Sequence, residues 1–217
     1  RTPLTSIKGY SDLLMEGTLG KMNYQQLKAV STVIRNTERL RRLVDSLLYV
    51  SMAEVEAIKY DLSKIDILEV IDNAVTDMAM PIAEKKIDVL RHVQEGIPQI
   101  EADAKKITDM LTNVLDNAVK FTPSQGKISI VAKKEGKMVH ISIEDSGIGI
   151  PAELLPHLFQ KFYQIDPSIR RKYGGTGLGL FISKNIVEAH KGKIWIESEE
   201  KKGTTVHILL PVLQGGT

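Results

Sequence analysis

Three polar side chains share one side of a helix that the sequence predicts over residues 104–120. At about 100° per residue, Asn113, Asn117 and Lys120 fall within about 60° of one another, beside an apolar stripe. Amide oxygens are hard ligands that suit Mg²⁺, which also keeps water and phosphate oxygens in its shell. The pattern therefore indicates either a site for an anionic ligand with magnesium, or a solvated helix edge with one amide satisfied inside the protein.

A glycine-containing loop begins at Asp145 and reads Asp-Ser-Gly-Ile-Gly, directly after a predicted strand. Glycines allow a ligand to approach the backbone closely, and an ionised aspartate can only accept hydrogen bonds. Such a loop could hold a flat heterocycle whose exocyclic amine donates to Asp145. An ordinary tight turn has the same pattern.

A second glycine run, Gly174–Leu180, opens a predicted helix. Backbone N–H groups and the positive end of the helix dipole make a helix N-terminus a natural seat for phosphate. A flexible hinge for the preceding segment explains the same glycines, and both interpretations can hold at once. The spacing matches neither the Rossmann nor the Walker motif.

Helical periodicity dominates residues 1–58. Apolar residues recur at helical spacing over 24–52, which predicts one long amphipathic helix, and the same rule holds over 2–14. Gly17 and Gly20 interrupt the pattern, so we expect a helical hairpin. Because two helices cannot cover both of their apolar stripes alone, a second copy would complete an antiparallel four-helix bundle.

Helix and strand patterns alternate in residues 59–217. The predicted helices are 68–82, 104–120 and 177–190, and the predicted strands are 87–93, 128–133, 138–144, 194–197 and 205–210. Helices interleaved with a mostly antiparallel sheet predict an α/β sandwich of the α+β class. Residues 151–176 fit neither period, as is typical of a functional lid or a disordered segment.

The composition excludes several classes of function. The 217 residues include 29 Lys plus Arg and 27 Asp plus Glu, a net charge of +2, so no basic excess points to nucleic acid. The lack of cysteine excludes disulfides, thiolate metal sites and cysteine nucleophiles. No apolar run is long enough to span a membrane, and we expect no signal peptide in these residues. Since position 1 is Arg, we expect a piece of a longer protein.

Taken together, these segments resemble the sequence boxes of the histidine kinase family, over essentially the whole chain. The resembling boxes are the N box Asn113–Thr122, the first glycine box Asp145–Gly149, the F box Phe159–Phe162, the second glycine box Gly174–Leu180 and the last glycine box Gly203–Thr205. The first five residues also resemble the end of the phosphoacceptor box, usually His-Glu-x-x-Thr-Pro. The boxes follow one another in the expected order and spacing.

The resemblance implies a dimeric helical hairpin followed by a Bergerat-type ATP-binding domain. Asn117 would coordinate Mg²⁺, Asn113 and Lys120 would approach the phosphates, and Asp145 would receive the adenine amine. The other implied ATP contacts are Gly147, Gly149 and Thr205 on the adenine side, and Gly175, Thr176, Gly177, Leu178, Gly179, Arg170 and Arg171 toward the phosphates. For the two arginines a solvated charge run is an equally good interpretation.

Two further features follow from the F box and the N box. Phe159 and Phe162 are three residues apart, so they would share one helical face, either as lid anchors or in simple core packing. Hydrolytic relatives of this ATPase superfamily carry Glu where this chain has Asn113. Because an amide cannot act as a general base at neutral pH, the sequence favours transfer of the γ-phosphoryl group to an external nucleophile.

The sequence departs from the family at its start. The acceptor histidine would lie three residues before Arg1, and none of the five histidines falls in the hairpin, so we expect Mg-ATP binding without autophosphorylation. Thr2 would either help orient water against a regulator's aspartyl phosphate or act as a helix cap. Gln164 stands where many relatives have Arg, and His190 is expected to complement a helix dipole with partial positive charge.

The sequence thus predicts the cytoplasmic catalytic core of a sensor histidine kinase. It would form a homodimer through residues 1–58 and act on the receiver domain of a response regulator, without nucleic acid, and would reach a membrane only through other parts of its parent. A nucleotide-binding regulatory module without phosphotransfer and a related hydrolase are the alternatives.

Overall fold

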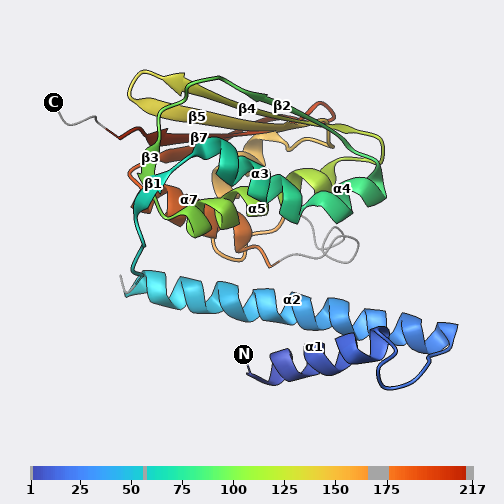
Figure 1. Cartoon of the computed structure of the whole chain (residues 1–217). Coiled ribbons are helices and arrows are strands. Elements are labelled where there is room, and N and C mark those ends of the chain that lie inside the picture. The colour runs from blue at the N-terminus through green and yellow to red at the C-terminus, as the bar shows by residue number, and fades with distance from the viewer. Residues whose placement is uncertain (1, 56–57, 166–175, 214–217) are drawn as a thin grey trace. The chain divides into compact units, whose positions relative to one another are not determined.

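The computed structural model describes residues 2–55, 58–165 and 176–213. Backbone contacts divide the chain into two compact units, Arg1–Ile58 and Lys59–Thr217 (Figure 1). No helix in these described ranges is long and apolar enough to cross a lipid bilayer. Each unit is considered separately below.

The first unit is a hairpin of two packed helices, α1 (Thr2–Met15) and α2 (Tyr24–Glu54). The turn between them contains Gly17 at φ +75° and Gly20 at φ +115°, values that favour glycine. Asn23 starts α2 with a capping box: its side chain accepts the Gln26 N–H at 2.9 Å, and the Gln26 side chain accepts the Asn23 N–H at 2.8 Å. The single long helix predicted over 24–52 is confirmed.

One apolar row of α2 stays uncovered within this unit. Val33, Leu40 and Leu47 recur every seven residues and are 45%, 48% and 49% exposed. Leu4, Ile7, Val33 and Leu40 line a shallow groove between the two helices together with three polar residues. A row of half-exposed large apolar side chains is unusual for a surface that faces water alone.

The second unit is a five-stranded sheet with helices on one face (Figure 1). The strand order is β2-β4-β5-β7-β6, where only the β2–β4 pair is parallel. Its strands are β2 (Asp88–Val93), β4 (Lys127–Glu135), β5 (Met138–Asp145), β6 (Lys193–Glu199) and β7 (Gly203–Pro211). Its helices are α3 (Ile67–Asp77), α4 (Ala79–Lys85), α5 (Ala104–Phe121), α7 (Gly179–Ala189) and the 3₁₀ helix η1 (Ala152–His157).

Alternation along the strands places the core between the sheet and the helices. Ile128 and Ile130 of β4, with Ile141 and Ile143 of β5, are at most 1% exposed, whereas the residues between them are not buried. Helix α5 packs against α3, α7 and β5, and its buried residues include Leu111. The predicted α/β sandwich is confirmed, with α5 at its centre.

The helix predicted over residues 68–82 is in fact two helices, so that prediction was wrong. Helix α3 ends at Asp77, and α4 begins at Ala79 after Met78, which has φ −98° and ψ 4°. Pro81 explains the break, because it has no N–H to donate to the Asp77 carbonyl and its ring clashes with that group in a continuous helix. The sequence also missed the short antiparallel pair β1 (Ser63–Ile65) and β3 (Ile100–Ala102), since three residues are too few to show a period.

Phe159 and Phe162 do not share a helical face, contrary to the sequence prediction. The 3₁₀ helix ends at His157, and Phe162 has φ +63° and is 59% exposed. Its N–H donates to the Gly177 carbonyl at 2.9 Å. A Cβ on Gly177 would lie 2.6 Å from the Phe162 carbonyl carbon. Phe162 is therefore held by close contact with the Gly177 backbone and is not part of a helix.

His190 lies at the C-terminal end of α7 as predicted, but not as a charged cap. Its Nε2 accepts the Asp103 N–H at 3.0 Å, so this nitrogen carries no proton. Its Nδ1 lies 2.7 Å from the Ile186 carbonyl and must be the donor there. The buried ring is therefore a neutral imidazole that joins the end of α7 to the start of α5.

Candidate functional site

The carboxylate of Asp145 lies at the end of β5, on the helix-covered face of the sheet. The residue is only 8% exposed, and its Oδ1 accepts the Gly147 N–H at 2.8 Å. Burial raises the pKa of Asp145 to about 6, against hydrogen bonds from the Gly147 and Thr204 backbones that lower it. A buried acceptor with few partners of its own is suited to receive a donor from a ligand.

The loop after Asp145 fits only because it contains glycines. A Cβ on Gly147 would lie 2.5 Å from Asp145 Oδ1 and 2.9 Å from the Phe121 carbonyl oxygen. Gly149 has φ +67°, and its Cβ would meet the Glu199 carbonyl oxygen at 2.0 Å. The two glycines thus keep the Asp145 carboxylate beside the end of α5 and the loop against the β6–β7 turn.

Hydrogen bonds fasten the same loop to the β6–β7 turn. The Ile150 N–H donates to Ser198 Oγ at 2.8 Å, and the Lys201 N–H donates to the Ile148 carbonyl at 2.7 Å. Ser198 Oγ in turn donates to the Gly203 carbonyl at 2.8 Å. The loop that carries Asp145 is therefore held in place by the sheet.

The polar side of α5 carries the three residues singled out by their spacing. Asn113, Asn117 and Lys120 are each half-buried, while Val114 and Ala118 between them are buried. Asn113 reaches the first residue of α7, because its Oδ1 is the atom nearest to a Cβ built on Gly179, at 3.8 Å. The Lys120 ammonium lies 5.0 Å from the centre of the Phe121 ring.

The start of α7 faces this side of α5. Thr176 Oγ1 accepts the Leu178 N–H at 3.0 Å, and Leu178 is 1% exposed, which anchors the segment. The helix begins at Gly179, two residues later than predicted, because Gly177 adopts φ +69°. The N-terminus of α7, which carries the positive end of its dipole, thus lies beside the Asn113 amide.

Several predicted site residues cannot be placed here. Gly175, Arg170 and Arg171 lie outside the described residues. Thr2 is the exposed first residue of α1 in the other unit, where its carbonyl accepts the Ser6 hydroxyl at 3.3 Å. The structure places Asp145 and Gly147 beside Phe121 at the C-terminal end of α5, and Gly179 at the start of α7 beside Asn113.

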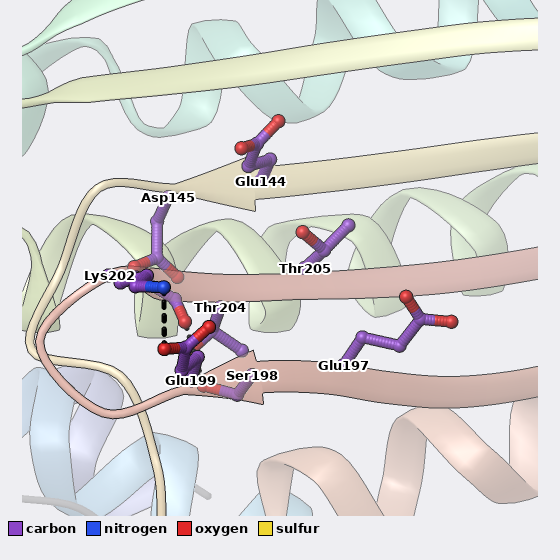
Figure 2. Close-up of a pocket in the computed structure, with 9 residues that line it drawn as sticks. Glu144, Asp145, Glu197, Ser198, Glu199, Lys202, Thr204 and Thr205 are labelled. Carbon is purple, nitrogen blue, oxygen red and sulfur yellow. Dashed lines mark hydrogen bonds and ion pairs between the residues drawn. The ribbon is translucent and has the colours of Figure 1, made fainter.

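The structure places Thr204, and not Thr205, beside Asp145. Thr204 pairs with Asp145 in the β5–β7 register, whereas Thr205 pairs with Glu144 and points to the outer face of the sheet (Figure 2). Thr204 Oγ1 also lies 2.9 Å from Ser198 Oγ. This argues against the role expected for Thr205. Strand alternation, with Val206 and Ile208 inward, was the signal in the sequence that favoured Thr204.

Figure 2 shows a hollow at this end of the sheet, lined mainly by acidic and hydroxyl side chains. Glu144, Glu197 and Glu199 line it together with Lys202. The Lys202 ammonium is 2.6 Å from Glu199 Oε1. Because these carboxylates would repel a polyphosphate, an anionic ligand fits better on the helix side, between α5 and α7.

Comparison with known families gives two matches. Residues 1–56 match the model of the His Kinase A (phospho-acceptor) domain. Residues 102–214, about half of the chain, match the model of the histidine kinase-, DNA gyrase B- and HSP90-like ATPase. The two matches fall on the hairpin and on the sheet-containing unit.

Curated relatives align along nearly the whole chain. A methyl sulfide methyltransferase-associated sensor of Methanosarcina acetivorans is 44% identical over 93% of this chain, and the sensor histidine kinase WalK of Bacillus subtilis is 35% identical over 97%. The aligned region spans 20% and 34% of those two proteins. The chain therefore corresponds to about a third or less of their lengths.

Solved structures show the same arrangement of elements. Full-length ShkA in complex with AMPPNP matches with a TM-score of 0.81 at 27% identity, covering all of this chain and 44% of that one. Histidine kinase ThkA in complex with response regulator protein TrrA matches with a TM-score of 0.67 at 25% identity, covering 97% of this chain and 58% of that one.

Proposed function

Because the chain belongs to the histidine kinase family, we propose that it is a core that binds Mg-ATP and transfers the γ-phosphoryl group to a histidine side chain. One observation carries this proposal. Two features occur in the same unit: the buried Asp145 carboxylate starts a glycine loop, and Asn113 meets the start of α7. An acceptor for a base and donors for phosphates are thus held by one fold.

The adenine would bind at Asp145. An ionised carboxylate accepts the exocyclic amine of adenine, whereas the carbonyl oxygen that guanine carries at that position would repel it. The bare backbone of Gly147, with no room for a Cβ next to Asp145 Oδ1, leaves the edge of the carboxylate accessible to a flat ring. Thr204 is placed by its register with Asp145 to line the same side.

The phosphates would lie between α5 and the start of α7. Lys120 offers a cation, and the N-terminus of α7 offers N–H groups and its dipole. Gly179 brings the start of α7 within van der Waals reach of Asn113, since the Asn113 Oδ1 and Cγ atoms lie 3.8 and 3.9 Å from its Cβ position. A phosphate chain bound at this junction would meet the Asn113 amide and the N-terminus of α7 together.

The donor set also fits magnesium. Asn117 lies one turn after Asn113 on the half-buried side of α5, and an amide oxygen is a hard ligand that Mg²⁺ accepts beside phosphate oxygens and water. When bound, the ion would neutralise charge on the phosphate oxygens. Asn117 would be the residue of this chain that holds it against the helix, while Asn113 would approach the phosphates.

The reaction would be transfer and not hydrolysis. Asn113 has no basic group to take a proton from water, so the γ-phosphoryl group remains available to a histidine nitrogen. The new N–P bond forms as the bond between phosphorus and the β,γ-bridging oxygen breaks, and ADP leaves. Positioning and charge stabilisation are sufficient for this chemistry.

The wider proposal concerns partners. The ThkA complex with a response regulator supports a receiver domain as the next acceptor, with Thr2 near that contact. The exposed row Val33, Leu40 and Leu47 supports a homodimer through residues 1–58. We place the working domain in the cytoplasm, where ATP and response regulators are found.

A transfer assay tests the proposal. The chain is incubated with γ-labelled ATP and a separate dimerisation hairpin that carries its acceptor histidine. We expect acid-labile label on that hairpin and little free phosphate. Steady release of phosphate without labelled protein, lost on Asn117→Ala, would instead identify a hydrolase.

A further inference from the structure

A lysine outside every sequence box closes the C-terminal end of α5. Lys85 is the last residue of α4, and its ammonium donates to three backbone carbonyls, those of Val119 at 2.7 Å, Lys120 at 2.9 Å and Thr122 at 2.9 Å. An ammonium has three N–H donors. All three therefore have an acceptor in the last turn of the helix that carries the proposed phosphate residues.

This contact completes the hydrogen bonding of the helix end. The last four carbonyls of an α-helix have no partner within the helix. The Ala118 carbonyl accepts both the N–H and the hydroxyl of Thr122, at 3.0 and 2.7 Å, and the next two accept from Lys85. The Lys85 carbonyl in turn accepts the Gln125 N–H at 2.9 Å, so α4 is joined to the α5–β4 connection from both sides.

The fourth carbonyl, that of Phe121, links this helix end to Asp145. Its oxygen would lie 2.9 Å from a Cβ on Gly147, and the same Cβ would lie 2.5 Å from Asp145 Oδ1. The Gly147 backbone therefore lies between the Phe121 carbonyl and the Asp145 carboxylate, in a gap too small for a side chain. A shift of residues 119–122 would move the Lys120 side chain and press on the loop that holds Asp145.

Charge adds a second effect. The C-terminal carbonyls of α5 carry the negative end of its dipole, close to Lys120 and therefore close to the proposed phosphates. The Lys85 cation lies directly on these carbonyls and cancels part of that field. Without it, a polyphosphate would meet a more negative surface.

We propose that Lys85 is a positioning residue for nucleotide binding, which fixes the last turn of α5 so that Lys120 and the Asp145 loop keep their binding geometry. This inference rests on the proposed function. Lys85 itself does not touch the nucleotide and acts through Lys120 and Phe121. A purely structural role would lower the stability of the fold but leave the affinity of the folded protein unchanged.

The test measures Mg-ATP affinity by isothermal titration calorimetry, at a temperature where circular dichroism shows each variant folded. We expect Lys85→Met to raise Kd about tenfold, which is the effect of losing roughly one charge-assisted hydrogen bond. Lys86→Met is the matched control. It removes the same charge one residue later, from an exposed position, and should change Kd less than about twofold.

A double-mutant cycle separates positioning from general damage. Because Lys85 acts in part through Lys120, Lys85→Met should raise Kd by a smaller factor in the Lys120→Met background than in the unsubstituted chain. An unchanged Kd in Lys85→Met, or full additivity of the two effects, would overturn the inference while leaving the nucleotide site intact. If the unsubstituted chain does not bind Mg-ATP, the proposed function fails and the inference fails with it.

A second variant covers the case in which Lys85→Met does not fold. Lys85→Arg keeps the charge, but its planar fork cannot direct three N–H groups to three converging carbonyls as an ammonium does. We expect an intermediate loss of affinity that is again smaller in the Lys120→Met background. An affinity equal to that of the unsubstituted chain would assign the effect to charge alone and contradict the positioning role.

Discussion

The carboxylate of Asp145, a residue only 8% exposed, accepts the N–H of Gly147 at 2.8 Å. This hydrogen bond and a second one from the Thr204 backbone lower the pKa of Asp145, but burial outweighs both and raises it to about 6. The free protein therefore keeps a carboxylate in a place where its charge is costly. A ligand that donates a hydrogen bond to it would relieve part of that cost.

Asp145→Asn should separate binding from stability. The amide presents donors where the adenine amine needs an acceptor, so ATP affinity should fall at least tenfold, while the free protein should gain roughly 1 to 3 kcal/mol at pH 8 because a buried charge is removed. Calorimetric titration and urea unfolding measure the two effects. Glu144→Gln, on the outer face of the sheet, should change both far less, because the Glu144 charge is the smallest of the four effects on the pKa of Asp145. A destabilised Asp145→Asn would contradict the electrostatic explanation.

The pH dependence of the two properties should be opposite in sign. The folded pKa of Asp145, about 6, lies above its ordinary value of 3.8, so the stabilising contribution is complete below about 3.8 and is lost as the pH rises through about 6. ATP binding needs the ionised form and should weaken as the pH falls through about 6. Binding that stays constant between pH 7.5 and 5 would argue against Asp145 as the adenine acceptor.

Two glycines with the same backbone conformation should respond differently to alanine. Gly149 and Gly136 have φ +67° and +63°, but only Gly149 has a carbonyl, that of Glu199, 2.0 Å from its Cβ position. Gly136→Ala should cost about 1 kcal/mol for its left-handed backbone. Gly149→Ala should cost roughly 3 kcal/mol or more, since the sheet edge must move. Equal costs in urea unfolding would show that the loop is not held as described.

The exposed row of α2 predicts self-association. Leu40 is 48% exposed in the single chain, and Leu40→Lys would place a charge in the middle of the proposed dimer interface. We expect this variant to sediment as a monomer at a concentration where the unsubstituted chain is a dimer. Gln25→Lys, exposed at the start of α2, should remain a dimer, and an unchanged mass for Leu40→Lys would exclude this row from the interface.

A histidine pair on the outer face of the sheet predicts acid sensitivity. His207 Nδ1 lies 3.1 Å from His140 Nε2, and its ring stacks on Trp195 with centroids 4.8 Å apart. Burial lowers the pKa of His207 below 6.5, although Glu197 raises it and His140 lowers it further. The stability contribution of neutral His207 is therefore present above pH 6.5 and is lost as the pH falls.

His207→Phe keeps the stack and removes the titrating group. The free energy of unfolding should then fall less between pH 7 and pH 5 than in the unsubstituted chain, by urea titration at each pH. An identical decrease in both proteins would assign the acid sensitivity elsewhere.

Periodicity was enough to predict the main elements of the fold. The long apolar repeat of α2 and the alternation in β4, β5 and β7 each cover several periods, so packing and local pattern agree. The break at Met78 was missed because the apolar pattern continues through it, although Pro81 prevents a continuous helix. Neither β1 nor β3 is long enough to carry a periodic signal.

The site was predictable where one segment carries the chemistry. The spacing of Asn113, Asn117 and Lys120 follows from helix geometry alone, and the structure keeps them on one side of α5. Thr204 and Lys85 were missed because their roles depend on contacts between distant segments. Lys85 is 37 residues from Thr122, one of its acceptors, and no local pattern encodes such a contact.

The most direct test of this account is a titration of the 217-residue chain with ATP, with and without Mg²⁺, beside Asp145→Asn and Asn117→Ala. We predict saturable binding at one site per chain, weakened by Asp145→Asn under both conditions. Asn117→Ala should remove the gain in affinity that Mg²⁺ provides and leave metal-free binding nearly unchanged. Affinities that are the same in all three proteins would contradict the site.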